Sequence, residues 1–126
     1  MAVLCGRALC AKDPSGSLMY NLTHYRDHVG AHPDKQFKST MFRSDRLMLG
    51  LNCLAPGQEQ HAHVHDGQDK FYFVVEGTGD FHVGDERQKA GEGAVVWAPA
   101  GVQHGVVNRS DSRLVLLVGI APFTGR

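Results

Sequence analysis

Short apolar runs bounded by glycine, proline, asparagine or aspartate recur along the chain from residue 45 onward. They are rich in valine, leucine and aromatic side chains, which favour strands, and none keeps the period of an amphipathic helix. Fifteen glycines and five prolines are scattered between the runs instead of being collected in one linker. This pattern predicts many short strands joined by tight turns. The expected strands lie within residues 45–57, 70–79, 80–88, 93–101, 104–108 and 112–122.

The spacing of these runs predicts an all-β fold, a small antiparallel barrel or sandwich. Residues 80–88 form a predicted hairpin with Gly84 and Asp85 at its turn, because glycine tolerates the positive φ that tight hairpin turns require. A chain of 126 residues is one domain by its length. The pattern is weak near the start, so we expect residues 1–40 to form an N-terminal arm with an edge strand or short helical turn. Residues 41–126 are expected to form the barrel domain.

Composition and charge exclude several classes of partner. Thirteen lysines and arginines balance thirteen aspartates and glutamates, and no basic stripe is present for a nucleic acid. The longest apolar run, residues 114–123, is about half the length of a membrane-spanning helix, so we expect no membrane partner. Residues 1–10 lack the order of a signal peptide, and the three cysteines form no CxxC pair. We therefore expect a cytoplasmic protein with buried thiols.

The segment with the strongest candidate chemistry is HAHVH at residues 61–65. Side chains alternate across a strand, so we expect His61, His63 and His65 to project from one face. Neutral imidazoles bind zinc, iron, nickel and copper, and two of them spaced two residues apart reach one ion. The triplet therefore predicts a metal site. A solvated histidine-rich edge strand and a chance cluster are the alternatives that it leaves open.

His104 is the candidate for a further ligand. It opens a short apolar run after Pro99 and Gly101, and these two residues suit a sharp turn. Proline holds φ at about −65°, and glycine accepts φ values closed to other residues. Such a turn would aim His104 inward. Alternation places Val106 and Asn108 on the same face, so we expect Val106 to add an apolar wall and the Asn108 amide to fix the following turn.

Together the two histidine segments resemble the two sequence motifs of the cupin superfamily. The positions that match the first motif are Gly57, His63, His65 and Gly77. Lys70 stands where this motif normally has glutamate. The positions that match the second motif, without exception, are Gly93, Pro99, Gly101, His104 and Asn108. The resemblance covers residues 47–120 and leaves the N-terminal third of the chain uncovered.

The resemblance implies an antiparallel jelly-roll barrel whose interior holds a divalent transition metal such as Fe, Mn, Ni or Zn. The ligands that it implies are His63, His65 and His104. His61 comes one step before the usual histidine pair, so we expect it at the rim of the pocket among residues that contact the substrate. The resemblance also implies a small-molecule ligand and a homodimer, in which apolar strand faces such as that of Phe71 and Phe73 are covered.

Lys70 is the departure from the cupin pattern, because an ammonium group has no lone pair for a metal. Three explanations stay open. The three histidines hold the metal with water or substrate, or Asp66 or Asp69 supplies a carboxylate, or the metal is lost and Lys70 binds an anion directly. If Lys70 points inward, alternation brings Tyr72 inward too, and both become candidates for substrate binding beside Val106. A further alternative is that Lys70 bends outward to a solvated ion pair with one of the two aspartates.

The predicted function is that of a metal-binding protein, a metal-dependent enzyme that acts on a small, anionic organic molecule. An open metal position polarises an oxygen atom or binds dioxygen, so dioxygenase, isomerase, lyase and decarboxylase types all fit. The alternative is a non-catalytic small-molecule binding or sensing protein, which the lysine at position 70 favours. Whether the chain is an enzyme stays open on the sequence alone.

Overall fold

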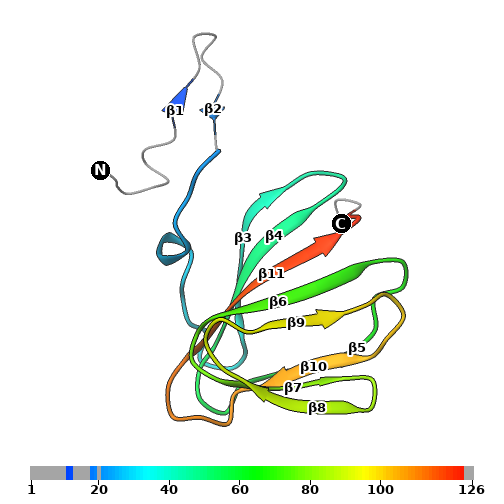
Figure 1. Cartoon of the computed structure of the whole chain (residues 1–126). Coiled ribbons are helices and arrows are strands. Elements are labelled where there is room, and N and C mark those ends of the chain that lie inside the picture. Colours follow the sequence, from blue (N-terminus) through cyan, green and yellow to red (C-terminus); the bar gives the residue numbers. More distant parts are fainter. Residues whose placement is uncertain (1–10, 13–17, 20, 124–126) are drawn as a thin grey trace.

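The structure of the protein is a computed structural model, which describes residues 11–12, 18–19 and 21–123. Two antiparallel sheets pack face to face (Figure 1). The five-stranded sheet has the order β3 (Phe37–Arg43), β4 (Met48–Leu54), β11 (Leu114–Ala121), β6 (Asp69–Glu76) and β9 (Val95–Ala98). The four-stranded sheet has the order β5 (Glu59–His63), β10 (His104–Val107), β7 (Gly79–Val83) and β8 (Glu86–Ala90). The predicted all-β jelly-roll barrel is confirmed. Among the described residues, no helix is long and apolar enough to cross a membrane.

The segment before β3 contains a two-stranded pair, β1 (Ala11–Lys12) with β2 (Leu18–Met19), and a 3-10 turn at Tyr25–Asp27. It contacts the barrel through its 3-10 turn, while the β1–β2 pair lies away from the two large sheets (Figure 1). The Tyr25 hydroxyl donates to the Glu76 carboxylate at 2.7 Å, and the Arg113 guanidinium donates to the same carboxylate at 3.0 and 3.2 Å. These bonds attach the turn to the outer face of the five-stranded sheet. The division of the chain at residue 40 stays a prediction.

Alternation along β6 decides which side chains enter the barrel. Lys70, Tyr72 and Val74 are buried, while Phe71 and Phe73 are half-buried on the opposite face. This confirms the predicted orientation of the strand. The buried core between the sheets consists of Leu54, Tyr72, Val74, Phe81, Ala98, Val106, Leu114, Leu116, Val118 and Ile120.

The outer face of the five-stranded sheet is covered in one part and exposed in another. Leu51, Cys53 and Val115 form a second buried cluster there, and Tyr25 packs against it. Cys53 is thus a buried free thiol, as expected, whereas Cys5 and Cys10 lie outside the described residues. On β9 the side chains of Val95 and Trp97 are 66% and 56% exposed, so this strand presents an apolar edge to solvent.

The predicted hairpin at residues 80–88 is confirmed as β7 and β8, with Gly84 in its turn at a φ of 58°. Residues that carry a side chain rarely adopt such a φ, so glycine is favoured at this position. The hairpin belongs to the four-stranded sheet, where β7 pairs with β10.

Asn108 joins the end of β10 to the turn before β11, as the sequence predicts. Its side chain is fully buried. Its Nδ2 group donates to the carbonyls of Leu54 and Ser112 at 2.8 and 2.9 Å. Its Oδ1 atom accepts from the backbone and the hydroxyl of Ser110 at 3.0 and 2.7 Å. One amide therefore satisfies backbone groups from two connections of the barrel.

Replacing Asn108 by alanine is expected to lower the free energy of unfolding by about 2–4 kcal/mol, because buried carbonyls lose their donors. Urea denaturation followed by circular dichroism measures this change. Ser110→Ala is the control, since Ser110 is partly exposed and its loss should cost only about 1 kcal/mol. Equal destabilisation by the two substitutions would contradict this role for the Asn108 amide.

Candidate metal centre

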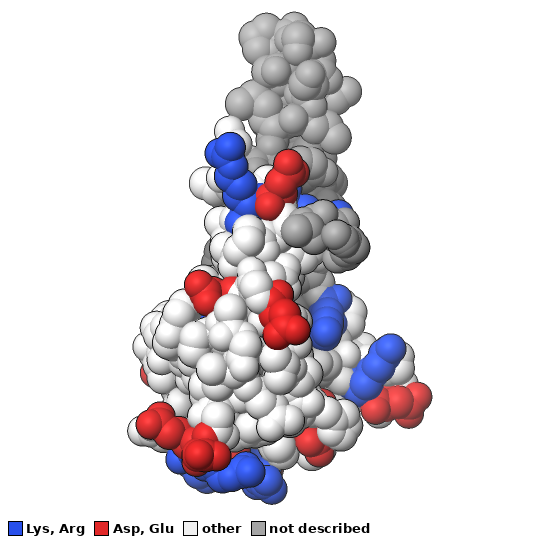
Figure 2. Space-filling view, turned by 90° about the vertical axis from the view of Figure 1, so that its right-hand side faces the viewer, with Lys and Arg blue, Asp and Glu red and all other residues white. Residues whose placement is uncertain are grey.

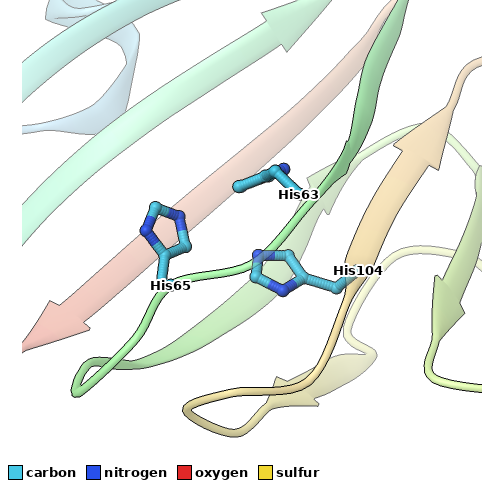
Figure 3. A group of neighbouring side chains, drawn as sticks. All are labelled: His63, His65 and His104. Atoms are coloured by element: carbon cyan, nitrogen blue, oxygen red, sulfur yellow. The ribbon is translucent and has the colours of Figure 1, made fainter.

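Three of the predicted histidines meet at one end of the barrel (Figure 3). His63 is the last residue of β5 and lies directly opposite His104, the first residue of β10. His65 lies two residues beyond β5, in the connection to β6. The Gly101 amide donates to the His65 carbonyl at 3.0 Å, and Gly101 has a φ of 78°. The predicted turn before β10 therefore also holds the loop that carries His65.

The three imidazole rings are close enough to share one ion. Their centroids are 4.3 Å apart for His63 and His104, 4.7 Å for His63 and His65, and 5.4 Å for His65 and His104. Their candidate ligand atoms all lie within 4.8 Å of one another. The three side chains could therefore hold a metal ion, each contributing one nitrogen.

Hydrogen bonds to the backbone determine which nitrogen of each ring is free. The Nδ1 atom of His63 donates to the His61 carbonyl at 2.8 Å, and that of His104 donates to the Val102 carbonyl at 3.1 Å. Each ring therefore presents the lone pair of Nε2. The Nε2 atom of His104 is buried and has no hydrogen-bond partner among the described residues. Buried polar atoms are rarely left without a partner, and a metal ion would supply one.

Burial of the three imidazole rings favours their neutral form, which is the form that binds a metal ion. Burial lowers the pKa of His63 and of His104 below the usual value for histidine. Burial and the neighbouring charges of His63 and Lys70 lower the pKa of His65 to about 4. All three rings are therefore neutral at pH 7, with lone pairs available for a divalent cation.

Lys70 points into the barrel, so the outward ion pair with an aspartate is wrong. Its ammonium donates to Oε1 of Gln60 at 3.4 Å and lies 4.7 Å from the ring centroid of Tyr72. The Tyr72 hydroxyl donates to the same Gln60 oxygen. Burial, with a smaller contribution from the charge of Lys38, lowers the pKa of Lys70 to about 7. The site thus contains an amine that is costly to keep charged unless an anion accompanies it.

The two aspartates near Lys70 lie outside the histidine group. Asp69 accepts a hydrogen bond from the backbone of Ala100 at 2.9 Å, so its carboxylate supports the turn before β10. Asp66 is exposed. Neither belongs to the group of potential ligands, which consists of His63, His65 and His104. The arrangement favours three histidines without a protein carboxylate.

The expectation that His61 shares a face with His63 and His65 is wrong. His63 pairs with His104, but Gln60 pairs with Val106, so His61 and Ala62 together face the single residue Gly105. This β-bulge shifts the alternation by one residue. His61 points to solvent, where its Nδ1 atom lies 3.1 Å from the Glu59 carboxylate. Contact between His61 and a substrate stays a prediction.

Gln60 is the site residue that sequence reasoning missed, because strict alternation from His61 places it outside. The bulge turns it inward, where it is 5% exposed and contacts both Lys70 and Tyr72. A signal existed in Gly105, since glycine within a strand often marks a bulge or a close backbone approach. Val106 is fully buried among the core residues, as alternation predicts, and its contact with a ligand stays a prediction.

The end of the barrel that carries the histidine loop has an uncharged middle. The connections β3–β4, β5–β6, β7–β8 and β9–β10 all lie at this end (Figure 1). Figure 2 views the molecule from this side, with the charged side chains around the margin of a broad area that carries none. Charge selection at the site therefore depends on groups inside the barrel.

Comparisons with known proteins agree with this architecture. The family model described as the cupin domain matches residues 50–120. An uncharacterised protein of Streptomyces coelicolor is 36% identical over 80 residues, which cover 64% of this chain and 75% of that protein. The crystal structure of a Thermus thermophilus protein is 39% identical, covers 83% of this chain and 99% of that one, and has a TM-score of 0.80. A predicted oxalate decarboxylase from Thermotoga maritima, 21% identical, covers 67% of this chain and 77% of its own, with a TM-score of 0.64, and shares the fold.

Proposed function

This chain belongs to the cupin family, and on that premise we propose that it is a metal-dependent enzyme that acts on a small, anionic organic molecule. The observation that carries the proposal is the buried Nε2 atom of His104, which has no partner among the described residues and lies beside His63 and His65. We assign these three histidines as the ligands of a divalent transition metal. The metal's identity, whether Fe, Mn, Ni or Zn, is a matter for metal analysis of untagged protein.

The protein residues around this centre have distinct parts in the proposal. A bound metal would act as a Lewis acid toward an oxygen atom of the substrate. Lys70 binds the substrate's anionic group, since a charge-assisted hydrogen bond offsets the cost of its burial. Gln60 holds Lys70 and Tyr72 in place through its Oε1 atom. The apolar core, which includes Val106, excludes bulk water from the site.

Replacing Lys70 by methionine is expected to leave zinc affinity near that of the wild type and to weaken acetate binding by about tenfold or more. Methionine is an unbranched side chain only one atom shorter than lysine, and it removes the charge. Lys70→Glu supplies a carboxylate instead, so it should bind zinc more tightly and repel acetate. Isothermal titration calorimetry measures both, first zinc into metal-free protein and then acetate into zinc-loaded protein.

Two outcomes of the Lys70 series would contradict the proposed role. Unchanged acetate affinity in both variants would show that Lys70 does not bind the anion. A loss of zinc affinity in Lys70→Met would show that the lysine supports the metal rather than the substrate. Circular dichroism of each variant provides the control for folding.

The second candidate is a non-catalytic protein that binds or senses a small molecule. The observation that favours it is Lys70 itself, a cation where cupins normally place the glutamate ligand. A turnover screen with the metal and dioxygen varied separates the two candidates, because tight binding of small acids without product would support the sensor. The same screen distinguishes dioxygenase, isomerase, lyase and decarboxylase chemistry. The homodimer and the cytoplasmic location stay predictions.

A further inference from the structure

A cleft of about 680 Å³ opens between β8 and β9, which are edge strands of the two different sheets (Figure 1). Its inner wall faces the space between the sheets, because Phe81 belongs to the buried core and Val96 packs against that core. Its lining is mainly apolar, and the apolar residues include Phe81, Val83, Ala90, Ala94, Val96 and Trp97.

The cleft adjoins the candidate metal centre on both sheets. On the four-stranded sheet, Val83 pairs directly with the ligand His104. On the five-stranded sheet, Val96 pairs with Tyr72, and Lys70 is the preceding interior residue of the same strand as Tyr72. Residues directly opposite one another share a face, with their Cβ atoms about 4.5–5.5 Å apart. A molecule held between Lys70 and the histidines would therefore extend past Val83 and Val96 into the cleft.

The interior is incompletely covered along this cleft. Val83, Ala90 and Val96 face the interior but are only half-buried. Phe81 lies beneath them, 4% exposed, with its ring 5.3 Å from that of Tyr72. Apolar side chains that remain partly in contact with water gain stability when a further apolar group covers them. An aliphatic chain lying along the cleft would supply that cover.

The charged groups of the cleft are all acidic. Asp85 and Glu86 belong to its lining, and no lysine, arginine or histidine does so among the residues that the structure describes. Glu86 lies near the centre, because it pairs with Val83, the strand neighbour of His104. Carboxylates here repel a second anionic group on a bound molecule. The cleft therefore suits an uncharged, apolar chain.

We propose that the cleft between β8 and β9 binds the apolar chain of the substrate, with Val96 as a specificity-determining residue. The substrate class is then a monoanionic acid with an aliphatic chain, its carboxylate at Lys70 and its chain in the cleft. This inference rests on the proposed function of Lys70 and adds the opposite end of the substrate to it. Asp85 and Glu86 select against acids that are charged at both ends.

The test measures acids of increasing chain length on untagged, zinc-loaded protein by isothermal titration calorimetry. The series is acetate, butyrate and hexanoate, with adipate as the acid that has the carbon number of hexanoate and a second carboxylate. Each methylene that enters the cleft is expected to tighten binding about two- to threefold, so hexanoate should bind at least about tenfold more tightly than acetate. Adipate should bind about tenfold more weakly than hexanoate, because its second carboxylate meets an apolar, acidic cleft.

Val96→Phe fills the cleft beside Tyr72 and should remove the gain with chain length, while acetate, which is too short to enter, binds as it does to the wild type. Val96→Thr keeps the shape of the side chain and replaces one methyl group by a hydroxyl, so hexanoate affinity should fall about threefold in a protein that folds normally. Val107→Phe is the matched control, since Val107 is half-buried and follows the interior-facing Val106 on β10, so it lies on the outer face. It should keep the full gain. Circular dichroism checks the fold of each variant.

A flat series in the wild type, a full gain in both Val96 variants, or equal binding of adipate and hexanoate overturns the inference. Sedimentation tests a second copy of the chain as the occupant, and a flat series together with dimers that Val96→Phe dissociates would assign the cleft to an interface instead. If acetate binding still depends on Lys70 in these cases, the proposed function stands and only the role of the cleft fails. If no acid binds the wild type, both fail.

Discussion

Replacing His104 by alanine is expected to lower metal affinity by about a hundredfold or more, whereas replacing His61 by alanine leaves it nearly unchanged. Replacing a group that only orients a metal ligand through a hydrogen bond lowers metal affinity by about 10- to 100-fold. Loss of a ligand itself should therefore lower metal affinity by about 100-fold or more. His104 provides the sole ligand from β10 and carries the buried, unpartnered Nε2 atom. His61 points to solvent beside Glu59.

The measurement is a zinc titration in competition with a chromophoric chelator, on protein without a polyhistidine tag. Circular dichroism of both variants shows whether the barrel is intact. Equal losses in the two variants would mean that His61 and His63 are the true pair and that β5 meets β10 in a different register. The matched variants therefore test the β-bulge as well as the ligand set.

Replacing Gly105 by alanine is expected to damage the centre without touching a ligand. A Cβ atom at this position would lie 2.7 Å from the Gln60 carbonyl oxygen and 2.7 Å from Cε1 of His82. The backbone of β5 would have to move away from β10, which displaces His63 from His104. Overpacking of this kind costs about 1–3 kcal/mol of stability. We expect zinc affinity to fall by about 10- to 100-fold, as when a supporting group is lost.

Gly91→Ala is the control for this substitution. Gly91 lies in the connection from β8 to β9, outside the left-handed region of φ, and an added Cβ atom would meet nothing closer than 3.8 Å. Its stability and zinc affinity should match those of the wild type. Urea denaturation and the same zinc titration apply to both. Normal zinc affinity in Gly105→Ala would show that the close approach of β5 and β10 does not hold the histidines together.

The strands and the inward residues of β6 could be predicted from the sequence, because they follow from local alternation. Along β6, the buried Lys70 and Tyr72 alternate with the half-buried Phe71 and Phe73, as the period of two in a strand requires. The same reasoning placed His104, Val106 and Asn108 on one face, and all three are buried. Spacing alone thus sufficed where a strand is regular.

Features that depend on pairing between distant strands could not be predicted. The bulge at His61 and Ala62 exists because of how β5 meets Gly105 on β10, a residue more than forty positions away. The bulge turns the Gln60 side chain into the barrel and the His61 side chain out to solvent. The contact of Lys70 with Gln60 is a consequence of the same shift, so the partner of this lysine emerged only with the structure.

The position of β11 determines when the barrel can form. This strand lies between β4 and β6 in the five-stranded sheet, yet it follows every other strand of both sheets along the chain. During synthesis, a chain that has not yet reached Leu114 leaves β4 and β6 without the neighbour that joins them. Both would present unpaired edges and apolar side chains to solvent or to a chaperone. Closure of the sheet must therefore wait until residue 121 has left the ribosome, and its long-range pairings are typical of slowly folding proteins.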